Sequence, residues 1–163
     1  SLIMIEAYLS QEPLGIESAN KKLIAMINWE ESAGYMVDIG VEESSFIAEK
    51  YYTNRKTRIY SENDVSEQNI KLLLSAGHPV IVPVAGRLLG NPNYKAPGPP
   101  YHKLIITGYT PTHFITNDPG TRNGENYPYK FQTIINAIHD WTGSKKTVLS
   151  GRKAILIVGN ASS

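Results

Sequence analysis

The stretch YHKLIITGYTPTHFITNDPGT, residues 101–121, predicts a β-hairpin, and the rest of the chain is best understood from it. Two runs rich in β-branched and aromatic residues flank Thr-Pro-Thr at residues 110–112, a composition typical of a turn. With the turn there, Asp118 faces Leu104 and lies diagonally next to His102. Since side chains alternate between the faces of a sheet, His102 and Asp118 share one face, with backbones roughly 7 to 8 Å apart. The spacing therefore permits a hydrogen bond between the imidazole and the carboxylate.

The pair of His102 and Asp118 would form half of a nucleophilic catalytic site. A hydrogen bond to a carboxylate fixes the tautomer of an imidazole, orients its ring and raises its basicity. Pro119 and Gly120 end the strand, so the carboxylate is expected at the rim of the sheet. The spacing alone equally allows His102 to be an exposed loop residue and Asp118 an ordinary turn residue before a proline. The sequence contains no cysteine and no Gly-x-Ser-x-Gly elbow that the pair could serve.

The composition is that of an ordinary globular domain. The chain of 163 residues has the length of one domain, and 41% of its residues are apolar against 19% charged. Its 16 basic and 15 acidic side chains leave a formal net charge of +1, which gives no electrostatic reason to expect nucleic acid. No apolar run approaches the roughly 20 residues of a membrane-spanning helix. We therefore expect no nucleic-acid partner and no membrane segment in these residues.

Helical patterns dominate the first half of the chain and strand patterns the second. We expect helices in residues 1–10, 16–32, 41–52, 66–76 and 131–141, and strands in residues 58–62, 79–84 and 153–159, in addition to the two strands of the hairpin in residues 101–121. The Gly- and Pro-rich stretch 86–101 and the polar stretch 118–130 are expected to be loops, and the basic run 54–58 a solvated loop. This order predicts an α+β domain, with one sheet packed by helices. Because the helical pattern is already present at Ser1, we expect a helix that begins upstream.

The other histidines give a weaker case for a metal site. Three histidines and an aspartate could in principle bind zinc. However, no two histidines lie four residues apart on one predicted helix, and His113 points to the face opposite Asp118. His78 is expected in a helix-to-strand turn and His139 on the polar side of the last helix. The segment TGSKKT, residues 142–147, lacks the glycine spacing of a phosphate loop. We expect no metal and no cofactor, with a metal-dependent hydrolase as an alternative.

Three segments carry a resemblance to a known family. GHPVIVPVAG (residues 77–86), PYHKLIITGY (100–109) and FITNDPGTRNGENYPYKF (114–131) resemble the bacteriocin-processing peptidases that cut double-glycine leaders, and their stand-alone relatives. The resemblance implies a single papain-like peptidase domain over residues 1–163, with a helical N-terminal half on a mainly antiparallel sheet. It also implies that His102 activates a cysteine and that Asp118 orients the histidine. In the family, the cysteine begins the first helix and a glutamine slightly upstream supplies an oxyanion-hole donor, so both are expected before Ser1.

The resemblance implies a cysteine peptidase acting on a peptide or protein substrate by a Cys-His-Asp mechanism. Without the thiol, the 163 residues are expected to be inactive. The loops 86–101 and 119–130 are the expected substrate walls, with contacts from Tyr94, Tyr101, Arg122, Glu125 and Tyr127. The alternative is a catalytically inactive peptide-binding module on the same fold. The family further implies a bacterial origin and an extracytoplasmic or cell-surface role.

Overall fold

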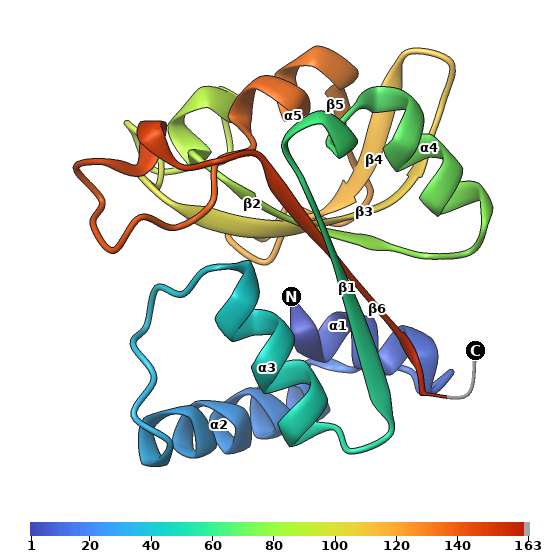
Figure 1. Cartoon of the computed structure of the whole chain (residues 1–163), viewed down its shortest axis with the longest axis vertical. Helices are drawn as coiled ribbons and strands as arrows, with labels where there is room; N and C mark the ends of the chain where they lie inside the picture. Colours follow the sequence, from blue (N-terminus) through green and yellow to red (C-terminus); the bar gives the residue numbers. More distant parts are fainter. Residues whose placement is uncertain (162–163) are drawn as a thin grey trace.

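The computed structural model describes residues 1–161, which form a six-stranded sheet with helices on both faces (Figure 1). All pairings are antiparallel, in the order β1–β6–β2–β3–β4–β5. The strands span Arg55–Ser61 (β1), Val80–Val84 (β2), His102–Tyr109 (β3), His113–Asn117 (β4), Tyr127–Lys130 (β5) and Ala154–Asn160 (β6). The C-terminal strand β6 therefore lies inside the sheet, where its apolar run is buried on both faces.

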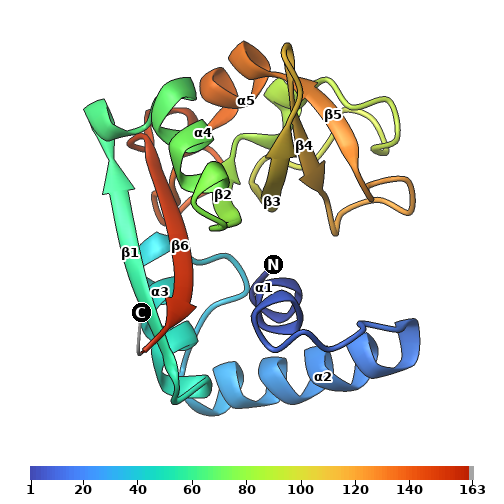
Figure 2. The ribbon, with the colours of Figure 1, turned by 90° about the vertical axis from the view of Figure 1, so that its right-hand side faces the viewer.

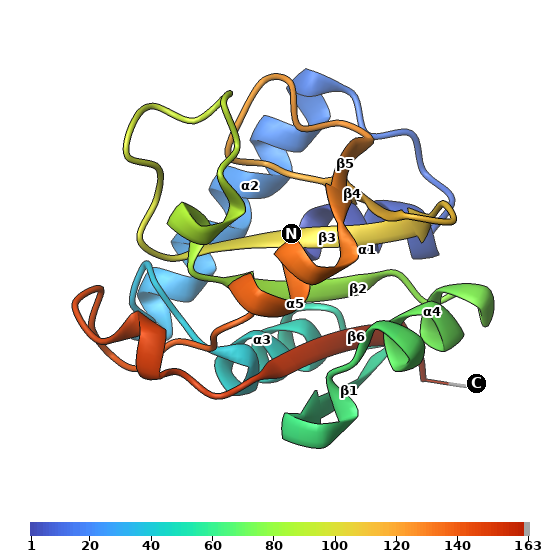
Figure 3. The ribbon, with the colours of Figure 1, turned by 90° about the horizontal axis from the view of Figure 1, so that it is seen from above.

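Three helices lie on one side of the sheet and two on the other. The first group comprises α1 (Leu2–Leu9), α2 (Ile16–Ser32) and α3 (Val41–Tyr51), and the second comprises α4 (Glu67–Ser75) and α5 (Phe131–Ala137). Figure 1 shows the first group below β2 and β3 and the second group above them, and Figure 3 looks down on the second group with the first group behind the strands. Short 3₁₀ turns occur at Glu62–Asp64 (η1), Gly86–Leu89 (η2) and Val148–Ser150 (η3). Within residues 1–161, none of the helices combines the length and the apolar character needed to cross a bilayer.

Side-chain alternation along the central strands builds two separate cores. Val82 and Leu104 are buried against α4 and α5, together with Ile134 of α5. Their strand neighbours Ile81 and Ile105 are buried on the other face against α1 and α3. Because each face is covered by helices, both sets of side chains are removed from water, which is the main stabilising contribution of this fold.

The predicted α+β architecture, with a helical N-terminal half packed on a mainly antiparallel sheet, is confirmed. The helix expected in residues 16–32 has those bounds in the structure. Ser66 caps the start of α4, where its hydroxyl accepts a hydrogen bond from the Asn69 backbone N–H at 3.2 Å. The helix expected in residues 131–141 ends earlier, because Ile138 is already extended.

Two loop predictions were wrong. The basic run 54–58 is mostly strand β1, whose Arg55 is buried and pairs with Glu6 at 2.7 Å. Part of the loop expected over residues 118–130 is the edge strand β5. In both places the strand is fixed by pairing with a distant segment, β6 for β1 and β4 for β5, and not by a strong local pattern.

The beginning of α1 lies between α2 and the part of the sheet formed by β3, β4 and β5 (Figure 2). Strand β3 begins at the same place with His102. The fold therefore brings the start of the first helix next to the start of a strand about a hundred residues later: the Ser1 hydroxyl donates to the Lys103 carbonyl across 102 positions of sequence, at 3.2 Å.

Candidate active site

The hairpin of β3 and β4 has the predicted register at the end that carries the site. Ile105 pairs with Asn117 and Ile106 with Thr116, as a turn at residues 110–112 requires. A bulge between Ile106 and Gly108 shifts the pairing by one residue nearer the turn. The bulge lies between these pairs and the turn. It therefore does not change which face of the sheet the side chains near His102 and Asp118 point to.

His102 and Asp118 lie within hydrogen-bonding distance. The Nε2 atom of His102 is 2.6 Å from Oδ1 of Asp118, and the side chains of His102 and Asp118 are 16% and 0% exposed. Oδ1 also accepts the backbone N–H of Gly120 at 2.8 Å, and Oδ2 accepts the hydroxyl of Tyr94. Burial raises the pKa of Asp118, but the hydrogen bonds from His102 and Tyr94 outweigh it and bring the pKa below its usual range. Asp118 is thus held as a buried carboxylate.

The orientation of the His102 ring leaves one nitrogen available. Because Asp118 is an ionised acceptor, the Nε2 atom of His102 carries the proton of their hydrogen bond. Within residues 1–161, Nδ1 has no hydrogen-bond partner, so the neutral imidazole presents a lone pair there. Tyr94 packs edge-on against the imidazole, with the ring centroids 6.0 Å apart. This arrangement prepares Nδ1 to act as a general base.

Two glycines allow the turn after β4 to close on the pair. A Cβ atom at Gly120 would lie 2.9 Å from Cε1 of His102 and 3.1 Å from Oδ1 of Asp118. A Cβ atom at Gly124 would lie only 2.0 Å from the backbone oxygen of Asp118. Because neither approach leaves room for a side chain, the pattern Asp-Pro-Gly-x-x-x-Gly is required by packing around the carboxylate.

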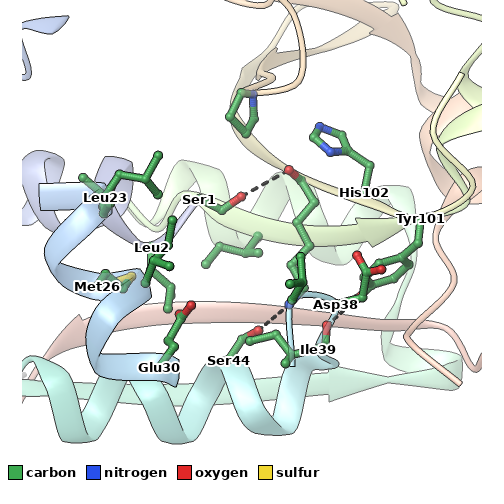
Figure 4. A pocket seen from close by; sticks show the side chains of 16 residues that line it. Ser1, Leu2, Leu23, Met26, Glu30, Asp38, Ile39, Ser44, Tyr101 and His102 are labelled. Carbon is green, nitrogen blue, oxygen red and sulfur yellow. Dashed lines mark hydrogen bonds between the residues drawn. The ribbon is translucent and has the colours of Figure 1, made fainter. Parts of the chain in front are cut away.

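The start of α1 opens onto the same cavity as His102. Ser1 and His102 line one cavity of about 300 Å³ (Figure 4). Pro119 of the turn after β4 also lines it. Its opposite wall is the side of α2 that carries Leu23, Met26, Ile27 and Glu30. Helix N-termini favour negative charge through the helix dipole and unpaired backbone N–H groups. A reactive group at the start of α1 would therefore face His102 in an environment that stabilises an anion.

A buried lysine joins the sheet to the helices at the bottom of this cavity. Nζ of Lys103 donates to the hydroxyl of Ser44 at 2.5 Å and to the carbonyl of Gly40 at 3.3 Å. Burial lowers the pKa of Lys103 to about 8, although nearby carboxylates, first Asp140 and then Glu43, oppose the shift. The sequence analysis missed this residue. The signal was available, because Lys103 is adjacent to His102 and must point to the opposite face of β3.

The carboxylate of Asp140 is a second buried group that the sequence analysis missed. Oδ1 accepts the backbone N–H of Val41 at 3.0 Å and that of Trp141 at 2.8 Å. It therefore supplies the side-chain acceptor for the first turn of α3, where Gly40 has none. Together with Lys103, it fixes the start of α3 against the sheet next to the cavity.

The residues predicted as substrate walls have different surroundings. Arg122 and Glu125 line a second cavity, of about 400 Å³, whose wall includes Asp118. Tyr101 lines the first cavity but is buried, with its hydroxyl donating to the carbonyl of Ile39 at 2.8 Å. The ring of Tyr127 packs on Tyr129, with centroids 4.8 Å apart, and Tyr127 lines neither cavity. The hydroxyl of Tyr94 is engaged with Asp118.

The other histidines lie apart from this site. The ring of His113 contacts the hydroxyl of Thr112 at 2.8 Å, and Nδ1 of His139 lies 3.0 Å from the carbonyl of Gly151. Across the described part of the chain, no three histidine, aspartate or glutamate side chains gather in a way that could hold a metal ion.

Comparisons with known proteins agree with the resemblance of the sequence. The Peptidase_C39 like family matches residues 1–148. A solved structure of a candidate C39-like peptidase from Bacillus anthracis is similar, at 15% sequence identity and a TM-score of 0.46. The match covers 69% of this chain and 56% of that one, so the chain spans little more than half of that protein's length. A search of the curated proteins found no match. On the strength of the family match, the chain belongs to the Peptidase_C39 like family.

Proposed function

We propose that this chain carries the histidine and aspartate of a papain-like cysteine peptidase, and that the thiol comes from residues that precede Ser1. The substrate would be a peptide or a protein. The observation that supports this best is that His102, locked by Asp118 through Nε2, opens onto the same cavity as the start of α1. A thiol a few residues before Ser1 would lie at the end of α1 that opens onto this cavity.

In the proposed mechanism, the pair of His102 and Asp118 would serve an acyl transfer to an upstream thiol. A cysteine at a helix N-terminus next to a protonated imidazole has a lowered pKa and is a thiolate at neutral pH. The thiolate would attack the peptide carbonyl, forming a carbon–sulfur bond, and the proton on Nδ1 of His102 would pass to the departing amine. Water would then attack the thioester while Nδ1 takes its proton, which breaks the carbon–sulfur bond, releases the acid and restores the thiolate beside a protonated imidazole. The buried carboxylate of Asp118 would stabilise the imidazolium in both steps.

The sequence encoded before Ser1, and the activity of the longer protein, test this proposal. We expect a cysteine within about ten residues upstream, and expect the longer protein to cleave peptides from an unbiased library. Replacing that cysteine by alanine should abolish cleavage without changing the urea midpoint of unfolding. An upstream segment without a cysteine, or cleavage that survives this replacement, would contradict the proposal.

A peptide-binding module without catalysis is the second candidate. It is favoured by one observation, the absence of cysteine from all 163 residues. A serine, alanine or glycine at the expected upstream position, together with peptide binding and no turnover, would support this candidate. In that case the cavity between α2 and His102 would serve binding alone.

A further inference from the structure

We propose that Tyr94 is a positioning residue, which holds Asp118, and through it His102, in the geometry that catalysis needs. The inference rests on the proposed function of the histidine–aspartate pair. Sequence analysis placed Tyr94 in a substrate wall, whereas its hydroxyl in the structure donates to Oδ2 of Asp118. The result is a continuous chain of hydrogen bonds from the loop after η2 through the carboxylate to the imidazole.

The carboxylate of Asp118 is held from three separate segments. His102 at the start of β3 and the backbone N–H of Gly120 both contact Oδ1. Among the described residues, Tyr94 supplies the hydrogen bond to Oδ2. Because the Asp118 side chain is 0% exposed, water has no access to replace the phenol as a donor. Loss of the Tyr94 hydroxyl would therefore leave half of a buried carboxylate without a partner.

Tyr94 is itself held firmly enough to orient its neighbour. Its ring packs edge-on against His102, and Gly98 passes beside it, where a Cβ atom would lie 3.5 Å from Cδ2 of Tyr94. The side chain of Asn123 donates to Asn93 at 3.0 Å, which ties the loop of Tyr94 to the turn after Asp118. Burial, followed by the hydrogen bond to Asp118, raises the pKa of Tyr94, so the phenol stays protonated and remains a donor.

The physical role follows from how a carboxylate binds an imidazole. A donor on Oδ2 prevents rotation of the carboxylate of Asp118 and keeps a lone pair of Oδ1 directed at Nε2 of His102. It also stabilises the ionised form, which is the form that selects the Nε2–H tautomer. Without this donor, Asp118 would take up a proton more readily, and the tautomer with a free Nδ1 would lose its preference. A residue that only contacts substrate would affect neither the ionisation of Asp118 nor the tautomer of His102.

Nuclear magnetic resonance on the 163-residue chain can test this directly, because neither readout needs the thiol. The variants are Tyr94→Phe and, as a matched control, Tyr101→Phe. Tyr101 is a buried tyrosine adjacent to His102 in sequence, and its hydroxyl donates to the Ile39 carbonyl instead of to Asp118. We expect Tyr94→Phe to move the ¹³C titration midpoint of the Asp118 carboxyl upward. It should also lower the Nε2–H population of His102 seen in ¹⁵N shifts, whereas Tyr101→Phe should change neither.

Unchanged titration of Asp118 and an unchanged His102 tautomer in folded Tyr94→Phe would overturn the proposal. If that variant does not fold, the ¹H spectrum of the wild-type protein is the test. A hydroxyl proton donated to a buried carboxylate gives a low-field signal that exchanges slowly. Absence of that signal for Tyr94 would also overturn it. In a longer, thiol-bearing protein, Tyr94→Phe should lower kcat by roughly tenfold or more with little change in KM. A change in KM alone would instead indicate that Tyr94 contacts the substrate.

Discussion

The two walls of the cavity at the start of α1 are built in different ways. On the sheet side, His102 lines the cavity and is held by the buried carboxylate of Asp118, which receives hydrogen bonds from three segments. On the helical side, α2 buries only Met26, while Leu23 and Ile27 line the cavity and are 47% and 39% exposed. One wall is polar with its hydrogen bonds formed, and the other is apolar and still accessible.

This difference separates two tasks within one site. Groups fixed by several hydrogen bonds keep a constant geometry, as a catalytic pair requires. Apolar side chains that remain accessible offer area to whatever enters the cavity, and they impose little directional preference. Changes on the sheet side should therefore disturb stability and the histidine–aspartate pair, whereas changes on the helical side should alter binding.

The largest effect is expected from Gly124→Ala in the turn after Asp118. The new Cβ atom would lie 2.0 Å from the backbone oxygen of Asp118. The backbone of the turn must therefore move away from the end of β4. We expect a loss of about 3 kcal/mol in the free energy of unfolding, measured by urea denaturation. Gly108→Ala is the control, because a Cβ atom there meets nothing within 4 Å. Equal losses in both variants would show that the turn is not tightly packed on Asp118.

An intermediate effect, visible through its pH dependence, is expected at Lys103. Burial lowers the pKa of Lys103 from 10.5 in the unfolded chain to about 8. Between these values the unfolded state binds the proton and the folded state does not, so stability should rise as the pH increases from about 8. Lys103→Met should flatten this rise in urea midpoints measured from pH 7.5 to about 9.5, before tyrosines ionise. The exposed Lys146→Met is the control, and the same slope in both variants would contradict the burial of the Lys103 charge.

The smallest effect on stability is expected on the helical wall. Leu23→Ala should change the free energy of unfolding by less than about 1 kcal/mol, because Leu23 is already half exposed. It should weaken peptide binding or raise KM several-fold, since each apolar group buried on binding contributes roughly 0.8 kcal/mol per CH₂. Ile24→Ala is the matched control, as Ile24 is exposed on the same helix and does not line the cavity. Equal effects of the two variants on KM would show that α2 does not contact the substrate through Leu23.

Much of the fold could be predicted because local patterns and tertiary packing agree. The apolar run of β6, the helix α2 and the register of the hairpin all follow from residues close in sequence. The same alternation that placed the hairpin core also placed His102 and Asp118 on one face. The relative position of His102 and Asp118 could therefore be predicted from the position of the turn and the two-residue period of a strand.

The features that sequence analysis missed depend on partners far away in the chain. Arg55 is buried because Glu6, 49 residues earlier, and Asn160 in β6 both contact its guanidinium. Strand β5 has a weak alternating pattern, with Tyr129 buried and Pro128 exposed, at the edge of the sheet. The link from Tyr94 to Asp118 crosses from an irregular loop, where no period indicates the direction of a side chain.

The central claim is that His102, oriented by Asp118, activates a thiol at the beginning of α1. The rate of alkylation of that thiol as a function of pH, in a longer protein that carries its own upstream residues, tests this most directly. We predict rapid alkylation at about pH 6 to 7 in the wild-type protein, and loss of this reactivity in His102→Ala without a change in near-ultraviolet circular dichroism. Equal alkylation rates in the two folded proteins would contradict it.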